Sequence, residues 1–130
     1  MPFVHVRIAG KTLSTAEMAA LQENVTDLME RVLHKKKSLT AIFIEEVAIK
    51  GWSVGAAPVP VAAHLEAAIT AGTNTSSEKA AFIAAAAQVL KRLFGDPLPV
   101  ATYVILREID AESWGYDGQT QAARRLTAMA

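Results

Sequence analysis

The fold is decided by a stretch of sequence that occurs twice. Residues 40–52 read TAIFIEEVAIKGW, and residues 102–114, 62 positions later (102 − 40), read TYVILREIDAESW. Threonine, glutamate and tryptophan recur at matching positions, and both centres are apolar. Repeats of this length correspond to one supersecondary unit used twice. The sequence therefore predicts a single domain, residues 1–130, built from two copies at about residues 1–57 and 61–130.

The first copy predicts a strand, a helix and a second strand. Residues 3–8 alternate apolar and polar side chains, as a strand with one buried face does. Ser14 and Glu17 form an S-x-x-E capping box, and the apolar stripe that follows indicates an amphipathic helix to about Leu33. Residues 40–47 form the closing strand. Two strands joined by such a helix make a parallel β-α-β unit with a right-handed crossover.

The second copy repeats this plan. Residues 65–70 form a weaker strand, Thr75 and Glu78 form the capping box, and residues 77–94 form an alanine-rich helix. Residues 100–108 form the closing strand. The two units predict an α+β fold, in which a four-stranded mixed sheet carries two helices on one face.

Two segments between the elements carry further expectations. Residues 34–37, HKKK, follow the first helix, where cations interact favourably with the helix dipole and stay solvated. Residues 55–60, GAAPVP, are a stiff and apolar connector that we expect to lie against the body of the protein.

The closing strands are apolar enough to predict that both faces of the sheet are buried. Their centres are Ile-Phe-Ile at residues 42–44 and Val-Ile-Leu at residues 104–106. Since two helices can cover only one face, the cover for the other face comes from further subunits. The sequence thus predicts an oligomer.

Composition excludes several classes of protein. Thirteen Lys and Arg residues balance thirteen Asp and Glu residues, so no net positive charge attracts nucleic acid or an anionic membrane. With 52% hydrophobic residues, the chain is typical of folded proteins. The longest apolar run, residues 80–87, falls well short of the roughly 20 residues of a membrane helix, and residues 1–15 lack a secretory signal pattern. We expect a cytoplasmic protein.

The sequence lacks patterns for metal or cofactor binding. It contains no cysteine, and His5, His34 and His64 do not have the spacing of metal ligands. Neither a glycine-rich phosphate loop nor a G-x-S-x-G motif occurs. We therefore expect no metal and no cofactor, and hydride transfer, phosphoryl transfer and serine hydrolysis have no support.

The order of these motifs resembles that of a known family. Pro2 directly after Met1, a strand to Gly10, a capped helix, an Ile-Phe-Ile-Glu-Glu-Val strand and then GWSVG at residues 51–55 resemble the tautomerase superfamily, specifically its 4-oxalocrotonate tautomerase-like group. Residues 108–118 are similar to the family's strand-to-hairpin segment. The resemblance implies a fused member with two β-α-β units in one chain, which assembles as a homotrimer with one amino-terminal site per chain.

Pro2 has the most distinctive chemistry. Methionine before proline is readily removed, and its removal would leave Pro2 with a free secondary amine. An α-amino group in the open has a pKa of about 8, and burial beside cations would lower that pKa toward neutrality. Such an amine can act as a general base or attack a carbonyl. In a chain that keeps Met1, this nitrogen is an amide with no basic lone pair.

The resemblance also implies substrate-binding residues. Lys11 stands where the family often has an arginine, although a lysine lacks the bidentate fork. The family's strand arginine corresponds to Ala41 in the first copy and Tyr103 in the second, so neither copy carries that charge. Arg107, on the same strand face as Tyr103, is the candidate replacement. Trp52 matches the aromatic wall of the family's pocket.

These observations favour a cofactor-independent tautomerase that acts on an enolisable 2-oxo acid or a related unsaturated carboxylate, with Pro2 as general base. Hydratase, decarboxylase or dehalogenase chemistry would use the same amine. A second hypothesis is a tautomerase-fold protein without catalysis that serves as an oligomeric binding or structural module. Loss of the strand arginine favours this second hypothesis.

Overall fold

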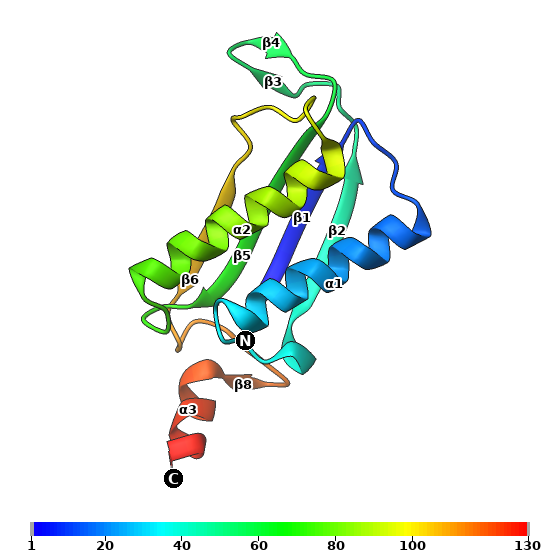
Figure 1. The fold of residues 1–130 in the computed structure, drawn as a ribbon. Coiled ribbons are helices and arrows are strands. Elements are labelled where there is room, and N and C mark those ends of the chain that lie inside the picture. The colour runs from blue at the N-terminus through cyan, green and yellow to red at the C-terminus, as the bar shows by residue number, and fades with distance from the viewer. Residues whose placement is uncertain (1, 130) are drawn as a thin grey trace.

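A computed structural model describes the backbone of residues 2–129 and the side chains of residues 2–127. Figure 1 shows a four-stranded sheet with two long helices packed on one of its faces. Met1, which precedes Pro2, lies outside the described residues, as does Ala130.

The first repeat has the expected elements. Strand β1 (Phe3–Ala9), helix α1 (Thr15–Arg31) and strand β2 (Ala41–Val47) follow one another, with a short 3-10 helix, η1 (Lys37–Leu39), before β2. The Ser14 capping box is formed in both directions. Strands β1 and β2 pair in parallel, as a crossover helix between them requires.

The second repeat has strand β5 (Ala62–Thr70), helix α2 (Ser76–Phe94) and strand β6 (Val104–Ile109). Two of its boundaries differ from the expectation by three residues or more. Strand β5 begins three residues earlier than expected, and β6 begins at Val104 rather than at residue 100. The chain turns before β6, because the Thr102 hydroxyl donates to the carbonyl of Pro99 at 2.6 Å and the Thr102 N–H donates to the carbonyl of Val100 at 2.8 Å.

The spacing of the two repeats is not uniform. The N-cap residues Ser14 and Thr75 are 61 positions apart (75 − 14), one fewer than the expected 62. The same 61 positions relate the buried strand residues Val4 and Leu65. The spacing of 62 holds only from the closing strands onward. A strand has a side-chain period of two, so the shift of one residue is what keeps the apolar face of β5 directed at the helices.

The strand order is β2-β1-β5-β6, with β1 and β5 antiparallel and the two outer pairs parallel. This arrangement confirms the expected α+β fold with a mixed sheet. The core lies between the sheet and the two helices. Its largest fully buried side chains include Phe82, Leu21 and Met29 from the helices and Ile8 and Ile69 from the central strands.

A hairpin follows each repeat. Strands β3 (Ser53–Val54) and β4 (Ala57–Pro58) form the first, and strands β7 (Gly115–Tyr116) and β8 (Gln119–Thr120) form the second. The expectation that the connector lies against the body is wrong: residues 55–58 are exposed, and Figure 1 shows β3 and β4 projecting beyond the sheet.

Helix α3 (Gln121–Met129), which the sequence analysis did not anticipate, follows the second hairpin. The guanidinium of Arg124 lies 3.8 Å from the ring centre of Tyr116, a cation–π contact that holds α3 against the hairpin. None of the helices within residues 2–129 combines the length and apolar character needed to span a membrane.

Candidate functional site

The face of the sheet opposite the helices is open. Residues that are opposite one another in register share a face, so Phe43, His5, Glu66 and Ile105 form one row across all four strands. Four of the exposed large hydrophobic side chains lie on this face: Phe3 at 47%, Phe43 at 51%, Tyr103 at 66% and Ile105 at 37% exposure.

Charged side chains on this open face form two groups, each centred on a glutamate. In the first group, Glu45 of β2 accepts a hydrogen bond from His5 Nε2 at 2.8 Å and lies 3.5 Å from Nε of Arg7. The His5 ring also stacks on Phe43, with ring centres 5.3 Å apart.

In the second group, Glu66 of β5 accepts from His64 Nε2 at 3.0 Å and from Arg107 Nη2 at 2.9 Å. These two hydrogen bonds hold the pKa of the Glu66 carboxyl below its ordinary value of 4.5. Arg107, the expected replacement for the strand arginine, is therefore already paired within its own chain, although its side chain remains 60% exposed.

Pro2 lies at the start of β1 and is buried. Its carbonyl accepts a hydrogen bond from the N–H of Ala41 at 3.2 Å, which joins it to the start of β2. Because β5 runs antiparallel to β1, the carboxyl end of β5 at Thr70 is at the same end of the sheet. We refer to this end as the Pro2 end.

The expected substrate-binding residues Lys11 and Trp52 are at the opposite end. Both follow the carboxyl ends of β1 and β2, so the seven residues of β1 separate them from Pro2 by about 20 Å at the rise of a strand. Lys11 is 3.2 Å from Glu17. A single copy of the chain thus does not bring Pro2 and these two residues together.

Trp52 and Tyr103 do come together. With His64 they line a hollow of about 330 Å³ beside the β3–β4 hairpin. Register explains this proximity, because Leu65 N–H donates to the carbonyl of Tyr103 and so places the start of β6 next to His64. Arg107 lies farther along β6, toward the Pro2 end.

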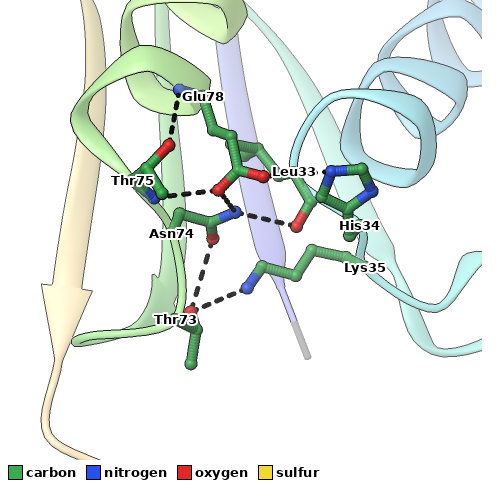
Figure 2. A network of polar contacts seen from close by, with 7 residues as sticks. All are labelled: Leu33, His34, Lys35, Thr73, Asn74, Thr75 and Glu78. Atoms are coloured by element: carbon green, nitrogen blue, oxygen red, sulfur yellow. Dashed lines mark hydrogen bonds and ion pairs between the residues drawn. The ribbon is translucent and has the colours of Figure 1, made fainter.

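The structure adds a residue that the sequence analysis placed in solvent. Figure 2 shows Lys35 directed inward, with its Nζ donating to the hydroxyl of Thr73 at 2.8 Å. The Thr73 hydroxyl in turn donates to the carbonyl of Thr70, which places this lysine at the Pro2 end. Burial lowers the pKa of the Lys35 ammonium, while the nearby Glu78 carboxylate opposes that shift. The expectation of a fully solvated lysine run is therefore wrong at this position.

A hydrogen-bond network surrounds Lys35 and joins the two repeats (Figure 2). Asn74 Nδ2 donates to the carbonyl of Leu33 at 2.9 Å and lies 3.3 Å from the carboxylate of Glu78. His34 Nε2 is 3.0 Å from the same carboxylate. Sequence patterns could not reveal this arrangement, because the contacts join segments about 40 positions apart that share no periodicity.

Comparison with known proteins finds a family match for the first part of the chain. Residues 2–61 match the family model described as "Tautomerase enzyme". No curated protein matches the chain. A solved structure described as "Q0 fused 4-OT wild type symmetric trimer" superposes with a TM-score of 0.82 at 22% identity, over 94% of this chain and 98% of that one.

Two further structures have the same fold. Pt0534, described as inactivated by 2-oxo-3-pentynoate, superposes with a TM-score of 0.80 at 15% identity, over 94% of this chain and 98% of that one. A macrophage migration inhibitory factor-like protein from Entamoeba histolytica superposes with a TM-score of 0.73 at 15% identity, over 92% of this chain and 97% of that one. Residues 2–61 thus match the tautomerase family, and the chain has the fold of the fused 4-OT structures, with two β-α-β units in one chain.

Proposed function

We propose that this protein is a cofactor-independent tautomerase that moves a proton within an enolisable 2-oxo acid or a related unsaturated carboxylate. The observation that carries the proposal is the match to the tautomerase family, which begins at Pro2. Pt0534, which has the same fold, is described as inactivated by the small 2-oxo acid 2-oxo-3-pentynoate. That description supports a substrate of this class here.

The proposed reaction needs one basic nitrogen. After Met1 is removed, the neutral amine of Pro2 takes a proton from the carbon beside the ketone, and the substrate becomes an enolate. The protonated Pro2 then returns a proton to another carbon of the same molecule, so that the substrate is isomerised and the amine is regenerated. Burial of Pro2 supports this role, because a buried amine is less hydrated.

The proposal includes a homotrimer. Lys11 and Trp52 are at the opposite end of the sheet from Pro2, so a pocket that contains all three needs another copy of the chain. The open sheet face, with Phe3, Phe43 and other exposed apolar side chains, supports burial against such copies. Relatives with this fold are described as trimers. In the trimer we assign Lys11, Trp52, Tyr103 and Arg107 to substrate binding.

Two other functions use the same fold. Hydratase, decarboxylase or dehalogenase chemistry would employ the Pro2 amine in its protonated form as an acid. A non-catalytic oligomeric module is the second candidate, and the absence of an arginine at Ala41 and Tyr103 favours it. A protein of that kind would not depend on a free Pro2 amine.

The test compares three forms of the protein with a small 2-oxo acid as substrate: processed protein, Pro2→Ala, and protein that keeps Met1. We expect Pro2→Ala to fold normally and to lower kcat by about 10²-fold or more, which is typical of a positioned acid–base group. Residual activity is expected, since this variant retains a primary amine. Protein that keeps Met1 is expected to be nearly inactive, because its Pro2 nitrogen is an amide.

Mass spectrometry assigns the state of Met1 in each sample before the kinetic assay. Equal activity of processed and Met1-bearing protein would contradict the Pro2 mechanism. Inactivity of all forms toward keto–enol, hydration and decarboxylation substrates would favour the non-catalytic module.

A further inference from the structure

A hollow of about 510 Å³ lies next to Trp52, at the carboxyl end of β2, and has a basic lining. Three of its lining side chains carry basic nitrogens: Arg7 from β1, Lys50 from the turn after β2, and His64 from β5. Ser53 adds a hydroxyl. Among the residues that the structure describes, no carboxylate is part of the lining, so the hollow favours an anion.

The charge of Arg7 is only partly neutralised. In register, Arg7 lies between Glu45 on one neighbouring strand and His64 on the other. Its contact with Glu45 is 3.5 Å long and involves Nε, which is one of five N–H donors of a guanidinium. The side chain is 48% exposed, so the remaining donors can reach a ligand in the hollow.

Lys50 supplies a second positive charge. Among the ion pairs of residues 2–127, none includes Lys50. Its position two residues before Trp52 places the ammonium group and the indole on the same short turn. An ammonium group that forms no ion pair, next to an indole ring, can bind an anion that carries a planar group.

Trp52 provides the planar surface. The indole is half-buried and borders this hollow and the smaller one that contains Tyr103. A ligand in the basic hollow therefore has an aromatic wall along one side, and a conjugated chain can stack on it.

We propose that this hollow binds the carboxylate of a small unsaturated organic acid, with Lys50 and Arg7 contacting the carboxylate and Trp52 packing against the conjugated chain. The inference rests on the proposed function, since it identifies the group that binds the substrate carboxylate. Ala41 and Tyr103 leave that carboxylate without a strand arginine. In this proposal β1 and the turn before Trp52 supply positive charge in addition to Lys11 and Arg107.

Binding is measured by Trp52 fluorescence in a Trp114→Phe background, in which Trp52 is the only tryptophan because the chain contains two. The probes are crotonate, a planar unsaturated carboxylate, and crotonamide, its neutral analogue. We expect saturable quenching by crotonate and none by crotonamide. Calorimetric titration of the unsubstituted protein repeats the comparison, in case the Trp114→Phe variant folds poorly.

Variants then locate the site. We expect Lys50→Gln and Arg7→Gln each to raise the Kd for crotonate about tenfold, because each variant removes one charged hydrogen bond to the carboxylate. Lys50→Arg keeps the charge and should retain binding. Lys91→Gln removes an exposed lysine of α2 that does not line the hollow, and should leave the Kd unchanged.

The proposal is overturned if crotonate and crotonamide behave alike, or if Lys50→Gln binds crotonate as tightly as the parent protein. Repeating the titration with Pro2→Ala separates the two proposals. If crotonate binds but turnover does not depend on Pro2, the proposed binding site stands and the catalytic role of Pro2 is wrong. If turnover depends on Pro2 but crotonate does not bind, the catalytic role stands and the proposed binding site is wrong.

Discussion

At the scale of single residues, polar side chains around Glu78 stabilise the junction between the repeats. The Thr75 N–H donates to the Glu78 carboxylate at 2.8 Å, and Asn74 and His34 contact the same group. The backbone hydrogen bond from Thr75, followed by the one from Asn74, holds the pKa of Glu78 below 4.5. One carboxylate thus caps α2 and connects it to the end of α1.

This depressed pKa predicts a pH dependence of stability. Since the folded-state pKa of Glu78 lies below its unfolded value, its contribution is fully present above pH 4.5 and is lost as pH falls through the folded-state pKa. We expect Glu78→Gln to be less stable than the parent at pH 7, with the difference shrinking toward pH 3. Urea unfolding at both pH values measures this.

The control for that experiment is Glu23→Gln, which changes an exposed carboxylate of α1. A Glu78→Gln difference that is the same at pH 7 and pH 3 would show that the ionised carboxylate contributes nothing particular at this junction.

At the scale of elements, the end of β1 and the start of β5 meet closely. Gly10 follows β1 with a φ of +81°, and a Cβ there would collide with the carbonyl oxygen of Pro60 and with Cα of Val61. This contact directs the chain from the projecting β3–β4 hairpin into β5. We refer to this close contact as the crossing point of the two repeats.

Replacement of Gly10 tests this crossing point. Gly72 is the matched control, because its φ is +78° and, apart from its chain neighbours, no described residue has an atom within 4 Å of the position of its Cβ. Both Gly→Ala variants incur the cost of a left-handed backbone, about 1–2 kcal/mol. Gly10→Ala is expected to lose at least about 1 kcal/mol more, because of the steric collision. Equal losses in urea unfolding would mean that the crossing point relaxes freely.

At the scale of the whole molecule, the open sheet face distinguishes the two sides of the protein. One side carries the helices, and the other carries exposed apolar side chains between two charged groups centred on Glu45 and Glu66. Those ion pairs are already formed within one chain. Burial of the apolar side chains between them therefore contributes most of the free energy of association with another copy.

A pair of isoleucines tests the proposed trimer. Ile105 on the open face is 37% exposed, and Ile83 on α2 is 41% exposed. We expect Ile105→Lys to give monomers at micromolar concentration, because a lysine would be buried at the interface without a partner. Ile83→Lys should remain trimeric. Size-exclusion chromatography with light scattering measures both masses, and a trimeric Ile105→Lys protein would place the interface elsewhere.

The sequence by itself determined the elements and their order. Capping boxes and side-chain periods of two and 3.6 act within one segment, so they predicted β1, α1, β2 and their counterparts to within a few residues. The predicted repeat spacing of 62 positions was wrong for β5 and α2. It came from matching identical residues, which does not detect which face of a strand is buried. The prediction that residues 55–60 lie against the body of the protein was wrong, because an apolar composition does not exclude a projecting hairpin.

Only the tertiary structure decided which side chains meet. It separated Pro2 from Lys11 and Trp52, buried Lys35 against Thr73, and brought Arg7 and His64 to the hollow beside Lys50. The physical reason is that strand order and register set these contacts between segments distant in the chain. Local periodicity specifies the face on which a residue lies, whereas pairing between strands specifies its neighbours.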